Sequence, residues 1–417
     1  MSPSSDRSRL TLKIVIGMIA GVAVGFTINL LGNPAGIDAW LTNGLFDVVG
    51  SLFIRSLRLI VVPLVFVSLV CGAAAMQDIR KLGRIGGKTV GLYLVTTTIA
   101  ISLGLTLGML VKPGDGLTLE TDAGFEAPEP PALTEVLTNI IPTNPIQAMA
   151  EGEMLQIITF SILLGLALTM AGEPGKRVLS AFEALNTVIM KLVLILIQLA
   201  PYGVFALLAK TFAQEGFEAI LPLAKYFFLV LGVLLLHAAV TYPFFLRGLG
   251  RMSPLPFFRK VRKAQIFAFS TASSNATIPV TLEVVEEELG VDNSISAFTV
   301  PLGATINMDG TAIMQGVATV FIAQASGIDL TLTQLVTVVL MATLASIGTA
   351  GVPGVGLIML TMVLVQVGLP IEPVGIILGI DRLLDMVRTA VNVTGDAAVT
   401  CIVGKSEDQL DEDVFNS

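Results

Sequence analysis

The sequence predicts an all-α polytopic membrane protein with two re-entrant helical hairpins. Of its 417 residues, 54% are hydrophobic and only 13% are charged, whereas soluble domains contain about 25% charged residues. Several apolar runs are long enough to cross a bilayer, and two others are interrupted by glycine, proline and hydroxyl side chains. Both cysteines lie in apolar segments and there is a single histidine, which excludes a disulfide framework and a multi-histidine zinc site.

The first three spans are expected at residues 12–31, 45–75 and 89–111. Between the second and third lie four basic residues, Arg80, Lys81, Arg84 and Lys88. The segment after the third span, residues 113–131, is acidic and contains no lysine or arginine. Because short basic loops stay in the cytoplasm, we expect both the N-terminus and this basic segment there, and the acidic segment outside.

Three further spans are expected at residues 154–170, 181–209 and 221–245. The pair Ala200-Pro201 predicts a kink in the longest of them. His237 is interpreted as a packed helix residue, with a proton relay as the alternative. A basic block at residues 247–263 is again expected inside, and the acidic end, residues 406–417, is expected to be a disordered cytoplasmic tail.

The two interrupted runs are Ala268–Val280, rich in serine, threonine and asparagine, and Ala345–Leu360, which holds four glycines and a proline. Glycine and proline free backbone groups from helical bonding, and at membrane depth those groups must meet protein, ions or water. Two such segments in corresponding positions indicate a transporter binding site. We interpret them as hairpins entering from opposite sides, each followed by a full span (residues 295–323 and 371–403), which forms an inverted repeat.

The span after the first hairpin contains Asn307-Met308-Asp309, flanked by Gly303 and Gly310. This pattern predicts a local unwinding of the helix that exposes carbonyl, amide and carboxylate oxygens, the ligands that an alkali cation prefers. Asn392 and Asp396 add an amide and a carboxylate from the last helix. An ion-free hydrogen-bond network is the alternative, although it would bury two carboxylates at a heavy desolvation cost.

The last span has a stripe of polar and charged residues between Asp381 and Asp396, which share roughly a 100° arc of the helix. Charges at membrane depth indicate a functional site. Arg388 and Asp385 are interpreted either as a buried ion pair or as a site for a substrate carboxylate and ammonium. In the second case, a substrate with a second carboxylate would place it against polar groups and a half-helix N-terminus at a hairpin tip. A substrate with two carboxylates and one ammonium group is an acidic amino acid.

The chain resembles the dicarboxylate/amino acid:cation symporter family, which includes the excitatory amino acid transporters and their prokaryotic homologues. The matching stretches span nearly the whole sequence: YLVTTT, PTNP, SSNATIPVT, PLGATINMDGTA, ASIGTAGVPG and DRLLDMVRTAVNVTGD. The resemblance implies a homotrimer whose protomers have eight transmembrane helices and two hairpins. It also implies a static scaffold (residues 1–88 and 113–212) and a transport domain (89–112 and 213–405) that moves as an elevator.

By this resemblance, Asp385 binds the substrate amine and Arg388 its side-chain carboxylate. The remaining substrate residues implied are Ser273, Ser274, Thr311, Val352, Gly356, Thr389 and Asn392. Three sodium sites are implied: the first at Gly303, Asn307, Asn392 and Asp396; the second at Thr305, Ser346, Ile347 and Thr349; the third at Tyr93, Thr96, Thr97, Asn307 and Asp309.

The expected function is sodium-coupled symport of glutamate or aspartate across the cell inner membrane, with sodium as the coupling ion. Proton-coupled transport of the same substrates and C4-dicarboxylate transport are the alternatives, and an ion channel is a more distant one. The sequence contains no pairing of a nucleophile with a base that would indicate an enzyme. The expected partners are the substrate, lipid and two further copies of the chain, not nucleic acid.

Overall fold

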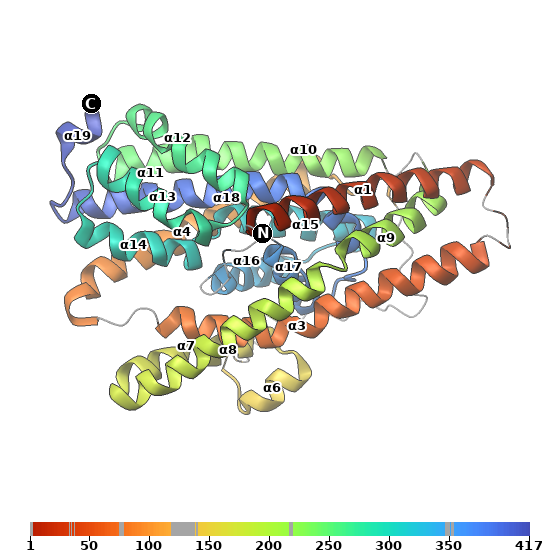
Figure 1. Ribbon diagram of the computed structural model, residues 1–417, viewed down its shortest axis with the longest axis horizontal. Coiled ribbons are helices and arrows are strands. Elements are labelled where there is room, and N and C mark those ends of the chain that lie inside the picture. The colour runs from red at the N-terminus through yellow and green to blue at the C-terminus, as the bar shows by residue number, and fades with distance from the viewer. Residues whose placement is uncertain are drawn as a thin grey trace.

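The computed structural model describes residues 3–32, 34, 36, 38–74, 79–117, 138, 141–216, 220–346, 351 and 354–417. Across these residues the protein is built from helices, with no β-strand (Figure 1). The helices form two groups, each defined by the elements that pack on one another.

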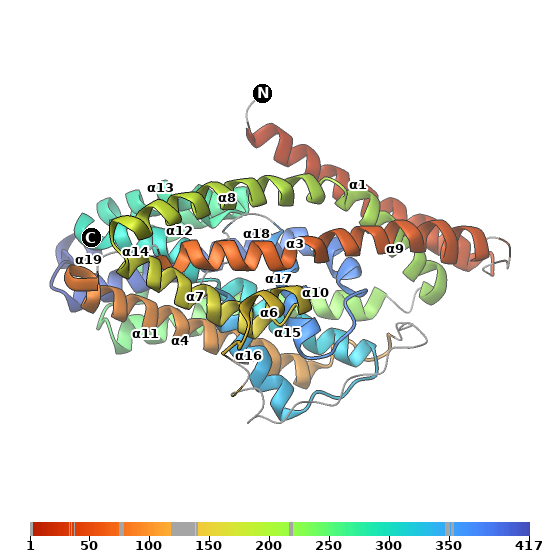
Figure 2. The ribbon, with the colours of Figure 1, turned by 90° about the horizontal axis from the view of Figure 1, so that it is seen from below.

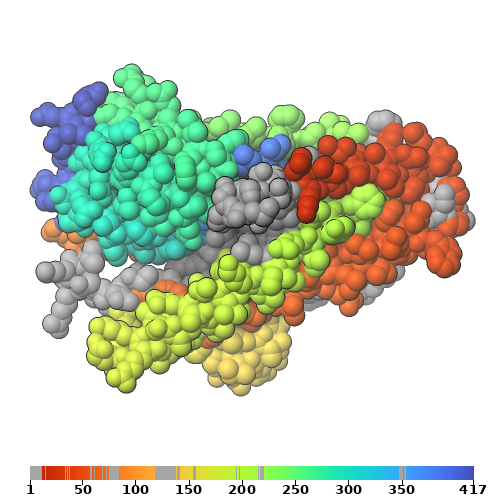
Figure 3. Space-filling model, in the orientation of Figure 1, coloured from red at the N-terminus to blue at the C-terminus, as the bar shows by residue number. Residues whose placement is uncertain are grey.

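The first group is centred on α3 and α9, which pack on one another and on α1, η1, α7 and α8, while α6 packs on α7. Its members are α1 (Pro3–Leu30), the π-helix η1 (Asp38–Phe46), α3 (Asp47–Ala74), α6 (Pro145–Glu151), α7 (Met154–Met170), α8 (Glu173–Ile197) and α9 (Ala200–Glu215). In the space-filling view α9 runs between α1 and α3 at one end of the molecule (Figure 3).

Glycines spaced by four residues bring α1 onto α9. A β-carbon added at Gly17, Gly21 or Gly25 would lie 2.4–2.6 Å from a carbonyl oxygen of α9, contributed in turn by Pro201, Phe205 and Ala209. Small residues at this spacing allow helix backbones to approach closely in a membrane. A larger side chain at any of the three would force the two helices apart.

The second group surrounds α18 (Val374–Ser406), a helix of 33 residues. Around it lie α4 (Ile79–Val111), α10 (Ile220–Leu236), η3 (His237–Thr241), α11 (Tyr242–Gly248), α12 (Pro254–Thr271), α13 (Ser274–Glu283), η4 (Val284–Glu288), α14 (Asn293–Ile306), α15 (Asp309–Ala325), α16 (Leu332–Ser346), α17 (Val355–Gln366) and α19 (Glu412–Asn416). Seen from below, α15 and α16 lie on the face opposite α8 (Figure 2).

Both predicted helix interruptions are confirmed. The helix expected at residues 181–209 divides between α8 and α9, directly before Pro201, because proline lacks the amide hydrogen that continues a helix. The second interruption separates α14 from α15, where Asn307 (φ −91°, ψ 88°) and Met308 (φ −113°, ψ 46°) leave helical conformation.

The first predicted hairpin consists of α12 and α13, which pack together. The chain turns at Ala272, which has a left-handed conformation (φ 48°). The Ser273 hydroxyl then caps α13 by accepting from the amide of Ala276 at 3.2 Å. The second hairpin consists of α16 and α17. Between them Gly351 lies at the tip of the first hairpin, where the Ser273 hydroxyl and the Asn275 amide both donate to its carbonyl.

Three helical stretches of the described chain are long and apolar enough to cross a membrane, namely Leu12–Leu30, Arg84–Val111 and Ile220–Gly248. Shorter apolar helices lie at Val62–Cys71, Gln156–Met170, Leu332–Ser346 and Val355–Gln366. The helix expected from residue 89 begins ten residues earlier, at Ile79. Its basic residues are therefore helical, and Arg84 and Lys88 pair with Glu407 after the end of α18.

The prediction of a disordered tail at residues 406–417 is wrong. After α18 the chain forms a bridge between Leu410 and Val291 and then the short helix α19. Phe415 is buried, with 1% of its surface exposed, and the Lys260 amine donates to its carbonyl at 3.1 Å. One buried aromatic side chain therefore anchors a segment whose composition alone predicts solvation.

Candidate functional site

There are two clusters of buried polar side chains, one on α18 and one between α18 and the helices α4 and α15 that pack on it, and the first surrounds Arg388. This arginine is 1% exposed and donates to both oxygens of Asp381, with Nη2 lying 3.0 Å from Oδ2. Its Nη2 also lies 2.8 Å from Asp385 Oδ1, and Arg382 Nη1 lies 3.5 Å from Asp385 Oδ2. We call these four residues the charged cluster.

The charged cluster contains the buried ion pair that was one of the two interpretations of Arg388 and Asp385. Its main acceptor, Asp381, had no role assigned from the sequence. The signal was present, because Asp381 precedes Arg388 by seven residues, or about two helical turns, and so shares its face. A bidentate carboxylate fixes the guanidinium plane more firmly than a single contact does.

Thr311 and Gly356, two predicted substrate residues, border the guanidinium. A β-carbon added at Gly356 would lie 3.1 Å from Thr311 Cγ2 and 3.5 Å from Arg388 Nη2. The structure thus brings α15, α17 and α18 together at this point, and the lack of a side chain at Gly356 lets the α17 backbone lie close to Thr311 and Arg388.

The remaining predicted substrate residues have other contacts. Thr389 donates to the Asp385 carbonyl at 2.8 Å, and the side-chain Oδ1 of Asn392 accepts from the Gly310 amide at 2.7 Å, which satisfies a free amide at the start of α15. Ser273 and Ser274 are buried at the hairpin tip. Among the hydrogen bonds of the described residues, none joins either serine to the charged cluster, and Val352 lies outside those residues.

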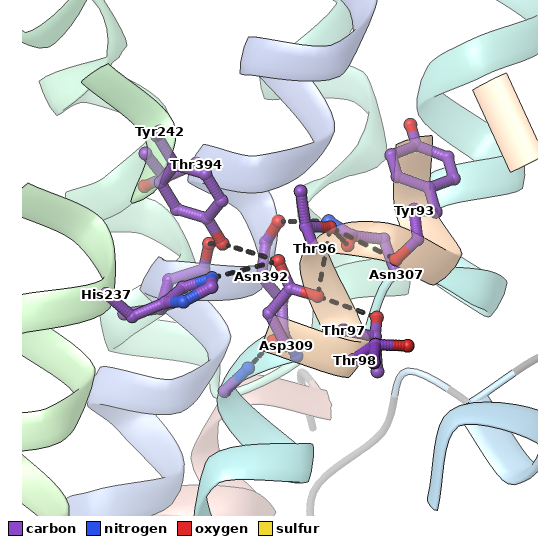
Figure 4. A network of polar contacts seen from close by, with 12 residues as sticks. Tyr93, Thr96, Thr97, Thr98, His237, Tyr242, Asn307, Asp309, Asn392 and Thr394 are labelled. Carbon is purple, nitrogen blue, oxygen red and sulfur yellow. Dashed lines mark hydrogen bonds and ion pairs between the residues drawn. The ribbon is translucent and has the colours of Figure 1, made fainter. Parts of the chain in front are cut away.

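The second cluster surrounds Asp309, and it brings together the whole third set of predicted sodium ligands (Figure 4). The Thr96 hydroxyl lies 3.1 Å from the Tyr93 carbonyl, 3.5 Å from Asn307 Oδ1 and 3.3 Å from Asp309 Oδ1. Thr97 donates to the same Asp309 oxygen at 2.7 Å. All five residues are at most 1% exposed. Five buried oxygens, one of them a carboxylate oxygen, fit a hard cation such as sodium. We call this group the oxygen cluster.

The first predicted set of sodium ligands adjoins the oxygen cluster. The Asn307 amide nitrogen donates to Asp396 Oδ1 at 2.9 Å and to the Asn392 carbonyl at 3.2 Å. Gly303 lies against the same carboxylate, since an added β-carbon would be 2.5 Å from Asp396 Oδ1. The amide of Asn307 therefore links the two sets, with its oxygen toward Thr96 and its nitrogen toward Asp396.

The second predicted set is not brought together by hydrogen bonds of the described residues. Thr305 donates to the Leu302 carbonyl and Ser346 to the Thr343 carbonyl, each within its own helix. Ile347 and Thr349 lie outside the described residues.

Sequence reasoning missed two partners of Asp309. His237 Nε2 lies 3.2 Å from Asp309 Oδ2, and the Tyr242 hydroxyl lies 3.0 Å from the same oxygen. His237 is buried as expected of a packed helix residue, but its ring also belongs to the polar network in Figure 4. No sequence pattern could indicate this contact, since His237 and Asp309 are 72 positions apart on different helices.

Discontinuous helices that enclose a buried arginine and a buried set of oxygen ligands are typical of secondary transporters. The chain belongs to the sodium:dicarboxylate symporter family, because it matches the sequence model of that family over residues 10–406.

Named relatives are similar along almost the whole chain. The proton/glutamate-aspartate symporter of Escherichia coli is 37% identical and covers 96% of this chain and 94% of its own length. The proton/sodium-glutamate symport protein of Geobacillus stearothermophilus is 36% identical, with 97% and 96% covered. The C4-dicarboxylate transport protein of Bacillus subtilis is 32% identical, with 97% and 94% covered.

Proposed function

We propose that this family member is a sodium-coupled symporter that moves glutamate or aspartate into the cell. The observation that supports this most strongly is the presence of two neighbouring buried sites. The charged cluster on α18 offers both a guanidinium and a carboxylate, and the oxygen cluster, on α4 and at the junction of α14 and α15, offers ligands suited to an alkali cation beside Asn392 of α18.

The substrate class follows from the charges of the first cluster. Arg388 is suited to a substrate carboxylate because its fork of donors can be shared with a second acceptor. Asp385 is suited to an ammonium group, since its side chain is 13% exposed while that of Asp381 is 4% exposed. Asp381 then keeps the guanidinium oriented while Asp385 exchanges its partner for the substrate amine. A dicarboxylate without an amine would place another negative charge beside Asp385 with only Arg382, at 3.5 Å, to balance it.

Sodium coupling rests on the second cluster. Asp309 and Asp396 are at most 1% exposed, and the partners that the described residues supply to them are hydroxyl, amide and imidazole groups rather than lysine or arginine. Burying an unpaired carboxylate is costly. A bound cation lowers that cost, so we infer that sodium accompanies the substrate.

We propose that the protein is a homotrimer in the cell inner membrane and transports its substrate by an elevator mechanism. Both termini of each protomer would lie in the cytoplasm. The first helix group, with residues 1–88 and 113–212, would be the static scaffold. Residues 89–112 and 213–405 would move as the transport domain. The packing of α4 (Ile79–Val111) with α15 and α16 rather than with α3 supports assigning α4 to the moving part, which would place the boundary at the start of that helix, at Ile79, rather than at residue 89.

Uptake into liposomes tests the proposal. Purified protein should accumulate radiolabelled glutamate or aspartate under an inward sodium gradient, and a panel containing succinate and neutral amino acids should be transported weakly or not at all. Accumulation driven by a pH gradient without sodium would indicate the proton-coupled alternative. Preferred uptake of succinate would indicate a C4-dicarboxylate carrier.

A further inference from the structure

The carboxylate of Asp309 is held from two sides. Its Oδ1 faces the hydroxyls of Thr96 and Thr97 on α4, and its Oδ2 faces His237 and Tyr242 on the opposite side (Figure 4). Only Oδ1 belongs to the oxygen cluster. The other oxygen is therefore occupied by contacts that do not belong to any predicted ligand set.

The direction of these two hydrogen bonds follows from their chemistry. An ionised carboxylate only accepts, so His237 Nε2 must bear the hydrogen that it presents to Oδ2. His237 Nδ1 is buried and has no hydrogen-bond partner within the described residues. The Tyr242 hydroxyl has one hydrogen and two nearby acceptors, Asp309 Oδ2 at 3.0 Å and the Val391 carbonyl at 3.1 Å, of which the carboxylate is the stronger.

Both donors are fixed in place by the surrounding helices. The His237 and Tyr242 rings pack edge to face with centroids 4.9 Å apart, across the π-helical turn η3, and π-helical turns frequently occur at functional sites. Gly395 of α18 makes room for this arrangement, since an added β-carbon would lie 2.7 Å from the Tyr242 hydroxyl and 2.5 Å from the Asn307 amide nitrogen. The donors thus have little freedom to follow Asp309 if its carboxylate rotates.

We propose that His237 and Tyr242 are positioning residues for the sodium site at Asp309. By holding Oδ2, they prevent the carboxylate from rotating and keep Oδ1 directed at the hydroxyls of Thr96 and Thr97, so that the ligand oxygens are oriented before the ion binds. Partners of this kind, one step removed from the ion, commonly change metal affinity by about 10- to 100-fold. The inference rests on the proposed sodium coupling and extends it to two residues that do not contact the ion.

The test measures sodium binding without transport. Purified full-length protein in detergent, with no amino acid present, is heated at a series of sodium chloride concentrations balanced with choline chloride, and the sodium concentration giving half-maximal thermal stabilisation is recorded. Tyr242→Phe removes one hydroxyl with almost no change of shape. His237→Leu removes the other donor, whereas His237→Gln retains a hydrogen donor at a similar reach. Tyr202→Phe, at a side chain that is 69% exposed on α9, is the matched control.

We expect Tyr242→Phe and His237→Leu to raise the half-maximal sodium concentration by about 10- to 100-fold, with stabilisation still reached at high sodium. His237→Gln should recover most of the wild-type value, and Tyr202→Phe should equal it. Normal sodium dependence in both Tyr242→Phe and His237→Leu would overturn the inference while leaving sodium coupling intact. A wild-type protein that sodium does not stabilise would instead overturn the proposed coupling, and this inference with it.

Discussion

The charged cluster on α18 and the oxygen cluster on α4 and at the junction of α14 and α15 are both buried, yet they balance charge in opposite ways. Around Arg388, two carboxylates and a second arginine compensate one another within the protein. Around Asp309, the carboxylate meets hydroxyl and imidazole groups. Because a buried charge must be paired, the first region is balanced within the protein, whereas for the second we propose a cation from solution.

This difference indicates which region responds to which ligand. In the proposed function, the contact between Arg388 and Asp385 is replaced by a substrate whose carboxylate binds Arg388 and whose ammonium group binds Asp385. The total charge of the charged cluster then hardly changes. The oxygen cluster gains a positive charge when the cation binds. Asn392 connects the two, because its side chain caps α15 at Gly310 while its carbonyl accepts from Asn307. Cation binding at one cluster can therefore influence the geometry of the other.

The largest expected effect is at Arg388. Arg388→Cys should lower glutamate and aspartate uptake by at least about 100-fold, since removing one partner of a buried ion pair costs about 3–5 kcal/mol. Uptake of labelled substrate into liposomes measures this, with the exposed Arg247→Cys as control. Unchanged acidic substrate uptake in Arg388→Cys would refute the assigned role, and gain of neutral amino acid transport would sharpen it.

The next effect concerns the cation. Asp309→Asn keeps the shape of the side chain but removes its charge, and hydrogen bonds to a charged group contribute about 1.5–3 kcal/mol. We expect the sodium concentration needed for half-maximal uptake to rise by about 10- to 100-fold. Asp329→Asn, in an exposed connection between α15 and α16, should behave as wild type. Unaltered sodium dependence in Asp309→Asn would contradict the proposal that the oxygen cluster, unlike the charged cluster, binds the cation.

A smaller effect should separate stability from ion binding. Asp381→Asn leaves Arg388 with a weaker partner, so the unfolding temperature should fall by several degrees in sodium and in choline alike. The exposed Asp413→Asn serves as the comparison. A destabilisation that appears only in sodium would mean that Asp381 belongs to the cation site after all.

The smallest effect lies outside the membrane-spanning helices, at Glu407. Hydrogen bonds and ion pairs from Lys88 and then Arg84 hold the pKa of this carboxyl below its usual value of 4.5. A lowered pKa in the folded state stabilises the protein at neutral pH, and that contribution disappears as pH falls below 4.5 and through the lower folded-state value.

Glu407→Gln should therefore unfold slightly below wild type at neutral pH, and the gap should close on acidification. Thermal unfolding of both proteins across that pH range measures it, with the exposed Glu372→Gln as reference. If the difference in unfolding temperature between Glu407→Gln and wild type persists in acid, it does not come from ionisation of Glu407.

Local features of the fold were predictable wherever local chemistry determines them. Pro201 breaks a helix by its missing amide hydrogen, and the glycines around Asn307 mark the unwound turn between α14 and α15. The helix expected at residues 154–170 coincides with α7. The tail was mispredicted because a single side chain, Phe415, finds a buried position that composition cannot reveal.

In the candidate site, too, contacts within one helix were predictable from the sequence, whereas contacts between helices were not. Asp381 could have been recognised from its position two turns before Arg388 on one helical face. The contacts of His237 and Tyr242 with Asp309 depend on how α10, η3 and α11 pack beside α15, and no periodicity within one helix encodes that. The motif resemblance supplied the ligand sets, but only folding shows that Asn307 is shared between two of them.

The most direct test of coupling between the two clusters is the affinity for aspartate at low and high sodium, measured by calorimetry on purified protein with choline as the balancing cation. Coupled sites change each other's affinity reciprocally, typically by about 5- to 150-fold. We predict that the aspartate Kd falls by at least about 5-fold as sodium replaces choline. An aspartate Kd that is the same in both salts would contradict the account.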